Sequence, residues 1–525
     1  MFIKKINPLL LCSLASGVLF ASCFPKFNFG RLTGWFCLIP LFWSLSRAGN
    51  ARQGAWLAFA AGVCGNLFIF NWIPVTLRAG GAHWPAAWTA WILLAAVIGV
   101  FWAGFGFCMK TAVERIKNSL VFAMAVGAAW VAFEFLRLAP VVFGGFPWCY
   151  LGYALIPVQP LAQLAEIGGV PLLGFLMVFT QALIWRAFCR RQTKLIALAA
   201  LIVSLAAGWG AWRLRSLTRV LNRTLDVAVI QGNIYQYEKW DDGRAAHVTA
   251  VYREMTREAN STNPDLIVYP ESFYPYALRM ESSGASLPAS DRIEFFKDIP
   301  MNKGTAYLGG LVLTDHRRFF NSVVCFLDGA ESGIYSKVRL VPFGEYLPFR
   351  WAIMPVLRFF VNAEETPVIV TTGEVTPGPT PMPIEVLPGI KAGFSVCYEA
   401  VFPVIARAAR RRGAKVLVNV TNDGWYLDTA APHQHFLMNI ARTIETRLPL
   451  IRAANTGISA VINPLGKVTA RAELNTRTVL SGFIEELPQP SLLWAESQTA
   501  FPWLCLFFTG ITVVAKLSNR GRIGK

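Results

Sequence analysis

Residues 389–403, GIKAGFSVCYEAVFP, join an apolar strand pattern directly to a helical pattern. The part up to Val396 predicts a buried strand, and the continuation through Gly413 has the apolar spacing of a helix. A single cysteine, Cys397, stands at the junction. On this stretch alone the cysteine is either a nucleophile or a small apolar residue at a turn. The order of strand, turn and helix favours an α/β domain.

The same alternation of short strands and helices extends over the chain from about residue 225 to residue 486. Apolar, β-branched segments such as LDVAVI (225–230) and PDLIVY (264–269) predict strands. Residues 241–260 and 433–447 have helical spacing. The pattern therefore predicts a layered α/β domain whose polar residues lie at strand ends.

Composition divides the chain into three parts. Of the 525 residues, 54% are hydrophobic and the mean hydropathy is +0.44, whereas a soluble protein has roughly 45–50% apolar residues. The excess lies in residues 1–215 and 493–525, while residues 216–492 resemble an ordinary soluble domain. We therefore predict N-terminal transmembrane helices in residues 1–215, then an aqueous domain in residues 216–492, then a C-terminal transmembrane helix with a short tail in residues 493–525.

The net charge of +18 belongs to the membrane parts. Residues 216–492 contain 28 Lys and Arg residues against 27 Asp and Glu residues, a net charge of +1, so +17 lies outside this domain. Basic residues in the loops beside apolar segments are typical of membrane proteins. Nucleic acid is therefore not an expected partner.

Eight apolar runs approach the roughly 20 residues that cross a bilayer. With eight spans, 15 Lys and Arg residues fall on the side of the N-terminus and six on the opposite side. The positive-inside rule then places both termini in the cytoplasm and residues 216–492 outside. An alternative is that LFASC (19–23) ends a lipoprotein signal peptide, with Cys23 as the new N-terminus. The runs lie near residues 8–24, 29–46, 54–77, 86–109, 119–138, 162–187, 195–212 and 496–515.

Three residues at the ends of predicted strands make a coherent set for acyl transfer: Glu271, Lys337 and Cys397. The thiolate is the reactive form of cysteine, and a nearby lysine favours it. Glu271 is a candidate general base for the thiol proton. Lys337 and the backbone N–H of Tyr398 are candidates to hold an oxyanion. Only a sheet that gathers distant strand ends would bring these residues together.

Each of these residues also has an ordinary structural interpretation. A strand-end Glu is often solvated, and a lone Lys is often at the surface. Cys397 could form a disulfide with Cys325 in an exported domain. The HQH segment (433–435) suggests a metal pair, but side chains two residues apart on a helix point away from each other. We therefore expect no metal site at this segment.

Three motifs resemble those of the nitrilase, or carbon–nitrogen hydrolase, superfamily. They are YPES (269–272), YSKVRLVPFGEYLP (335–348) and FSVCYEAVFP (394–403), in that order. The segments NVTNDGWY (419–426) and RAANTGISAVINPLGKV (452–468) resemble those that follow the nucleophile there. Together with the membrane segments, almost the whole chain is similar to the membrane-embedded branch of that superfamily, the apolipoprotein N-acyltransferases.

The resemblance implies an αββα nitrilase-like sandwich fused to a bundle of about eight transmembrane helices, with the sandwich on the periplasmic side of the bacterial inner membrane. It implies that Cys397 takes the sn-1 acyl chain of a phospholipid, typically phosphatidylethanolamine, as a thioester. The acceptor would be the α-amine of an N-terminal diacylglyceryl-cysteine in an apolipoprotein. The implied ping-pong reaction needs no metal and no cofactor.

The resemblance also assigns site residues. Glu271 and Lys337 match the base and lysine of the family. Supporting positions are Glu345, Tyr398, Glu399 and Trp240, and Trp148 matches a position near the lipid entrance.

The sequence adds two features near the lipid route. Glu134 and Arg137 stand one turn apart near the outer end of a span, where they either pair or touch a lipid headgroup. Residues 339–363 form a Pro-broken, aromatic segment that either dips into the membrane interface as a lid or packs on the protein.

Two other functions stay open at this stage. The same Glu-Lys-Cys set would serve a membrane-tethered amidase or nitrilase that uses water as acceptor. A transporter or scaffold whose sandwich only binds a partner would not need the Cys397 thiol. The membrane spans and the aromatic segment favour the transferase.

Overall fold

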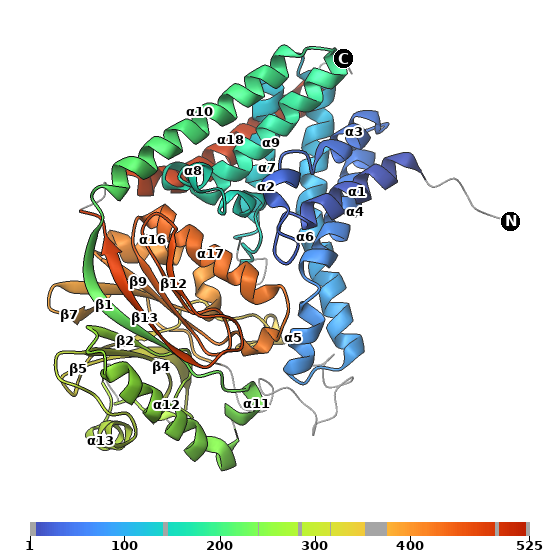
Figure 1. The fold of residues 1–525 in the computed structure, drawn as a ribbon. Helices are drawn as coiled ribbons and strands as arrows, with labels where there is room; N and C mark the ends of the chain where they lie inside the picture. The colour runs from blue at the N-terminus through green and yellow to red at the C-terminus, as the bar shows by residue number, and fades with distance from the viewer. Residues whose placement is uncertain are drawn as a thin grey trace. The chain divides into compact units, whose positions relative to one another are not determined.

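A computed structural model of the chain describes residues 7–139, 145–239, 241–281, 286–315, 317–351, 375–488 and 493–520. Contacts divide the chain into two compact units (Figure 1). The first unit comprises residues 1–75, 83–216 and 491–525, and the second comprises residues 76–82 and 217–490.

The first unit is helical. Its helices are rich in Leu, Ala, Phe and Trp on all sides, which is typical of helices that face lipid as well as protein. The helices of residues 7–218 and 493–520 are α1 (Pro8–Ala21), α2 (Gly30–Thr33), α3 (Ile39–Arg47), α4 (Ala51–Ile69), α5 (Ile73–Ala79), α6 (Trp84–Arg115), α7 (Ser119–Leu136), η1 (Leu151–Leu155), α8 (Gln159–Ala162), α9 (Ala165–Arg190), α10 (Lys194–Thr218) and α18 (Leu493–Arg520).

Among the residues that the structure describes, four helices are long and apolar enough to cross a membrane: α6, α7, α9 and α10. A fifth span results if α4 and α5, which meet at an angle of 48°, are counted as one. The predicted span 8–24 contains only the 14-residue helix α1, and the predicted span 29–46 is divided between α2 and α3. The predicted number of eight is therefore not confirmed, because an apolar run does not by itself make a continuous helix.

The second unit contains two sheets. The first has the strand order β13-β1-β2-β4-β5-β6, with β3 paired to β4, and the second has the order β12-β11-β10-β9-β8-β7. At the centre of the first sheet β1, β2 and β4 run parallel, and at the centre of the second β8, β9 and β10 do so. The strands are β1 (Asn222–Gln231), β2 (Leu266–Val268), β3 (Leu278–Arg279), β4 (Ala306–Thr314), β5 (Phe319–Leu327), β6 (Ala330–Ser336), β7 (Ile384–Leu387), β8 (Ile390–Val396), β9 (Val416–Thr421), β10 (Leu450–Ala454), β11 (Ala460–Ile462), β12 (Val468–Arg471) and β13 (Thr478–Glu486).

The helices of this unit lie on the outer faces of the two sheets. Helix α12 packs on β1 and β13, and α16 packs on β8 (Figure 1). The predicted helix after Cys397 begins with a short 3₁₀ turn, η4 (Cys397–Val401), before α16 starts at Pro403. The helices and turns are α11 (Gln236–Lys239), η2 (Asp242–Arg244), α12 (Ala245–Asn260), α13 (Ala289–Asp298), η4, α16 (Pro403–Arg411), η5 (Asp423–Tyr426) and α17 (Ala431–Thr446).

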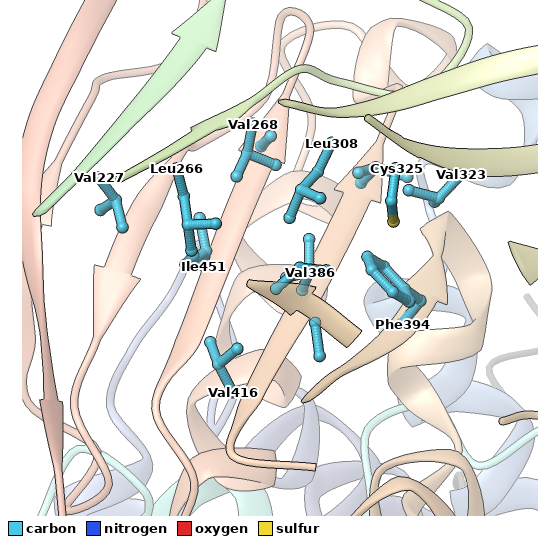
Figure 2. Close-up of a cluster of buried hydrophobic side chains, with 14 of the residues drawn as sticks. Val227, Leu266, Val268, Leu308, Val323, Cys325, Val386, Phe394, Val416 and Ile451 are labelled. Atoms are coloured by element: carbon cyan, nitrogen blue, oxygen red, sulfur yellow. The ribbon is translucent and has the colours of Figure 1, made fainter. Parts of the chain in front are cut away.

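Apolar side chains fill the space between the sheets as well as the space beneath the helices. Along β1, Val227 and Val229 face the opposite sheet, whereas Ala228 and Ile230 join the cluster under α12 and α13, as the two-residue period of a strand requires. A third cluster joins α16 and α17 to the second sheet. The unit is thus an αββα sandwich, as predicted. Figure 2 shows the layer between the sheets, with Val227, Leu266, Val268, Leu308, Val323 and Cys325 of the first sheet and Val386, Phe394, Val416 and Ile451 of the second.

The topology brings several strand ends to one edge of the sandwich. Glu271 follows β2, and Lys337 follows β6, which runs in the same direction as β4 because two antiparallel pairings separate them. Asn321 lies near the start of β5, which runs the opposite way. In the second sheet Cys397 follows β8 and Asn422 follows the parallel neighbour β9.

Candidate active site

Glu271 is held in one orientation by its neighbours. Its carboxylate accepts hydrogen bonds from the side-chain amide of Asn321 at 2.6 Å and from the backbone N–H of Asn422 at 2.7 Å. Its backbone carbonyl accepts a bond of 2.7 Å from the Nζ of Lys239, a buried lysine whose pKa burial lowers to about 8. The side chain of Glu271 is 9% exposed. The base candidate is therefore a buried and fixed carboxylate.

Lys337 lies between two carboxylates. Its Nζ is 2.8 Å from Oε1 of Glu345 and 3.8 Å from Oε1 of Glu271, and its side chain is 1% exposed. Burial alone would lower the pKa of Lys337, but the negative charges of Glu345 and Glu271 raise it above its ordinary value. The lysine is thus a permanent cation at the centre of the site.

Asn321 is hydrogen-bonded to Glu271, Glu345 and Lys337. It was not among the candidate residues identified from the sequence. Its side-chain amide donates to Glu271 and, at 3.0 Å, to Glu345, while its backbone carbonyl accepts the N–H of Lys337 at 2.8 Å. The side-chain amide of Asn321 therefore sets the spacing of the two carboxylates, and its backbone carbonyl holds the backbone of Lys337. The available signal was its place directly after Phe319 and Phe320, at the start of an apolar strand.

Cys397 occupies a strained turn between β8 and η4. Its φ of +48° lies in the left-handed region, which costs a residue with a Cβ roughly 1–2 kcal/mol. The residue is 7% exposed, and its thiol interacts electrostatically with Glu271 and Lys337. The three residues predicted from the sequence thus meet at one place.

The protonation of the thiol differs from the prediction. A lysine was expected to favour the thiolate, and Lys337 does lower the pKa of Cys397. Burial and the negative charge of Glu271 have the larger effect, however, and together they raise the pKa to about 12. The resting group is therefore a neutral thiol, so a base must remove its proton when it reacts.

The two alternatives for the cysteines and histidines are not realised among the described residues. Cys325 and Cys397 are both free thiols, and Cys325 lies fully buried in the layer between the sheets (Figure 2). His435, which was weighed as half of a metal pair, instead bonds to the backbone of Cys397 and to Asp423. Cys397 is thus available as a nucleophile.

Comparisons with known proteins match most of the chain. A sequence model described as "Carbon-nitrogen hydrolase" matches residues 226–486, and one described as "Apolipoprotein N-acyltransferase N-terminal domain" matches residues 16–183. The "Apolipoprotein N-acyltransferase" of Geobacter metallireducens is 30% identical, over 97% of this chain and 95% of its own length. This chain belongs to the apolipoprotein N-acyltransferase family.

Two further proteins are similar to this chain. An "Apolipoprotein N-acyltransferase" of Brucella suis is 32% identical over 84% of this chain and 80% of its own length. A solved structure of Saccharomyces cerevisiae Nit3, a member of branch 10 of the nitrilase superfamily, aligns with 18% identity and a TM-score of 0.37 over 53% of this chain and 94% of its own. Membership in the apolipoprotein N-acyltransferase family makes this chain an acyltransferase, and its apolar helices fit a membrane protein.

The supporting glutamates expected for an apolipoprotein N-acyltransferase connect separate loops of the site. Fully buried Glu399 accepts the backbone N–H groups of Val338 and Arg339 on one oxygen, at 2.7 and 2.9 Å. Its other oxygen accepts the N–H of Val396 and the hydroxyl of Tyr335, both at 2.8 Å. One carboxylate therefore ties the loop of Lys337 to the loop of Cys397.

Glu345 and Tyr398 lie in the same region. Glu345 binds Lys337 through Oε1 and, through Oε2, accepts the N–H of Val341 at 2.8 Å, so it both neutralises the lysine and folds its own loop. Tyr398 is 5% exposed and packs edge-on against Phe402, with ring centroids 5.1 Å apart. Trp240, together with residues 352–363 of the aromatic segment, lies outside the described residues.

Glu134, Arg137 and Trp148 meet within the helical unit. Oε1 of Glu134 accepts the N–H of Leu151 at 2.7 Å, and the guanidinium of Arg137 donates to the carbonyl of Trp148. In this described part of the chain the two charged residues do not pair with each other but both bind one loop. Trp148 is 1% exposed and packs on Trp72, with ring centroids 5.3 Å apart.

Proposed function

We propose that this protein moves an acyl chain from a phospholipid to the α-amine of a diacylglyceryl-cysteine, through a thioester on Cys397. The observation that supports the proposal best is the convergence of Cys397, Glu271 and Lys337 at one buried edge of the sandwich. The names of the relatives favour lipoproteins as acceptors over water.

The first half-reaction begins from the neutral thiol. Sulfur attacks the ester carbonyl of the phospholipid while Glu271 takes the thiol proton, so that an S–C bond forms and the carbonyl oxygen becomes an oxyanion. Lys337 is the cation nearest to this new charge. When the ester C–O bond breaks, Glu271 returns the proton to the leaving oxygen, which gives a lysophospholipid and a thioester.

The second half-reaction reverses these roles. The neutral α-amine of the acceptor attacks the thioester, an N–C bond forms and the C–S bond breaks. Glu271 takes a proton from the nitrogen and passes it to the departing sulfur, which restores the thiol. Because the site residues are nearly fully buried, water has little access to compete with the amine for the thioester.

The test uses the purified full-length protein and phosphatidylethanolamine labelled in the sn-1 acyl chain, with no acceptor present. We expect a labelled adduct that hydroxylamine removes, because hydroxylamine cleaves thioesters. Cys397→Ala should abolish it, whereas Cys325→Ala is the matched control and should keep it, since Cys325 is a core residue. The same lipid labelled in the sn-2 chain should give no adduct.

Three results would contradict the proposal. One is an intact enzyme that acylates lipopeptide but never forms the adduct, and another is an adduct that survives in Cys397→Ala. The third is hydrolysis of a soluble amide without any lipid, which would favour the membrane-tethered hydrolase.

The finer assignments form part of the proposal. Phosphatidylethanolamine is the donor, and Trp148 lies near the route by which lipid enters. Residues 216–492 form the catalytic domain on the periplasmic side, between residues 1–215 and 493–525 with about eight spans in total and cytoplasmic termini. The positive-inside count supports this topology.

A further inference from the structure

His435 lies directly behind the nucleophile. It projects from α17, its side chain is fully buried, and its Nε2 is 3.0 Å from the backbone carbonyl oxygen of Cys397. A carbonyl oxygen only accepts hydrogen bonds, so Nε2 must have the proton. The imidazole therefore donates a hydrogen bond to the peptide unit that joins Cys397 to Tyr398.

The other ring nitrogen fixes the orientation of the imidazole. Nδ1 is 3.1 Å from Oδ1 of Asp423 and 3.2 Å from Nη2 of Arg452. Burial and the positive charge of Arg452 lower the pKa of His435, against the opposing effect of the Asp423 carboxylate. Because both ring nitrogens face buried polar groups, the ring has one defined orientation.

Asp423 and Arg452 form a rigid support for this ring. Both side chains are fully buried, and Nη2 of Arg452 is 2.7 Å from Oδ2 of Asp423. Arg452 also donates to the carbonyl of Ile458 at 3.1 Å and to the side chain of Asn419. The guanidinium is therefore held by several elements, and the ion pair has little freedom to move.

Residues 421–423 connect the ion pair of Asp423 and Arg452 to Cys397 and to Glu271. Thr421 donates to Oδ1 of Asp423 at 3.1 Å and also hydrogen-bonds to the Cys397 thiol. Between these two residues, Asn422 donates its backbone N–H to Glu271. The three-residue segment 421–423 thus contacts the base on one side and, through His435, the backbone of the nucleophile on the other.

We propose that His435, held by Asp423 and Arg452, is a positioning residue that locks the strained backbone of Cys397 at the correct distance from Glu271. His435 does not touch the substrate in this proposal. The left-handed φ of Cys397 would otherwise relax, because a residue with a Cβ disfavours it. The inference rests on the acyl transfer proposed above, since it assigns the network to the proton transfer between Cys397 and Glu271.

The experiment compares three substitutions of His435 in the full-length protein. His435→Gln places an amide N–H near the position of Nε2 and should keep most of the activity. His435→Asn has the same amide on a shorter side chain and should not reach the carbonyl of Cys397, and His435→Leu removes the donor altogether. We expect His435→Asn and His435→Leu to slow formation of the labelled acyl adduct by roughly 10- to 100-fold, with KM for the phospholipid little changed.

Melting temperature and amide hydrogen exchange distinguish a positioning role of His435 from a general contribution to the stability of the protein. Melting temperature is measured for each variant, and amide hydrogen exchange is measured for a peptide that covers residues 393–403. We expect faster exchange in His435→Asn and His435→Leu than in His435→Gln at similar melting temperatures. If His435→Leu does not fold, the comparison of His435→Asn with His435→Gln decides. Equal rates of adduct formation in His435→Gln, His435→Asn and the unaltered protein, or losses of rate that simply follow melting temperature, would overturn the inference.

Failure of the two proposals would look different. If the unaltered protein forms no adduct, the proposed thioester reaction fails whatever the variants do. Amide hydrogen exchange of residues 393–403 still tests the positioning role of His435 in that case. Unchanged exchange in His435→Asn and His435→Leu would overturn that role. Slower adduct formation together with faster exchange supports both.

Discussion

At the scale of single residues, Lys337 and Glu271 have opposite effects on the pKa of the Cys397 thiol. Lys337 favours the thiolate, but Glu271 and burial favour the thiol more strongly and raise its pKa to about 12. The cysteine therefore stays protonated at neutral pH until a base acts. This arrangement suits a nucleophile that should react only when substrate is bound beside Glu271.

Glu271→Gln separates the two effects of this carboxylate. Loss of the base should slow acyl-adduct formation by about 10²–10⁴-fold. Loss of its negative charge should lower the pKa of Cys397, so that alkylation by iodoacetamide at pH 8 becomes faster, by about tenfold for each unit by which the pKa falls. Lys337→Met should do the reverse and slow alkylation, since it removes the positive charge. Slower alkylation of Cys397 in Glu271→Gln would refute the conclusion that Glu271 raises the pKa of the thiol.

Glu399 offers a second test, because its four hydrogen bonds are all accepted ones. Glu399→Gln replaces one acceptor oxygen by an NH₂ group, which leaves two donors without a partner at a cost of about 1–3 kcal/mol each. We expect a lower melting temperature and slower acylation, because the loop of Lys337 loses its anchor. The control is Glu385→Gln, at an exposed position of the edge strand β7, which should change neither.

The sequence indicates candidate site residues where polar residues end apolar strands. Glu271, Lys337 and Cys397 have this pattern and interact electrostatically in the structure, and their catalytic roles stay predictions. Asn321 and His435 could not be found in this way. Their partners lie on distant elements, and an Asn at the start of a strand or a His in a helix has no distinctive neighbour in the sequence.

At the scale of elements, close contact between helices α4 and α6 depends on glycine. A Cβ on Gly106 would overlap the Cβ of Ala58 and lie 2.7 Å from the carbonyl oxygen of Gly54. Small residues let the backbones of membrane helices approach, and dispersion contacts then stabilise the pair. The apolar composition of α6 reveals a span but not this contact surface.

Gly106→Ala should therefore force the two helices apart. We expect a drop of several degrees in the melting temperature in detergent, because overpacking typically costs 1–3 kcal/mol. Gly208→Ala in α10 is the matched control, since nothing lies within 4 Å of the Cβ that it would add. The control should be neutral or slightly stabilising, as Ala favours helix more than Gly does. Equal effects of both substitutions would refute the contact.

Elements of the sandwich were easier to predict than those of the membrane part. Along β1 the two-residue alternation separates the layer between the sheets from the layer under the helices, and the sequence shows it directly. In residues 8–46 the apolar pattern is continuous, whereas the backbone breaks into α1, α2 and α3. Hydropathy reports burial in lipid, but local turns decide where a helix ends.

At the scale of the whole molecule, charge is distributed by region. Residues 216–492 are almost neutral at +1, and the remaining +17 lies in the parts that contain the apolar helices. A neutral surface does not by itself attract anionic lipid or nucleic acid. Orientation in the membrane must therefore come from the basic loops, which the translocation machinery tends to leave in the cytoplasm.

Fusions to alkaline phosphatase test this orientation, because that reporter needs disulfides and becomes active only in the oxidising periplasm. A fusion after Gln192, in the turn between α9 and α10 beside Arg190 and Arg191, should be inactive. A fusion after Val220, past the end of α10, should be active, since the span between the two points reverses the side. The opposite pattern would place the catalytic residues in the cytoplasm, away from the apolipoproteins that the proposal requires as acceptors.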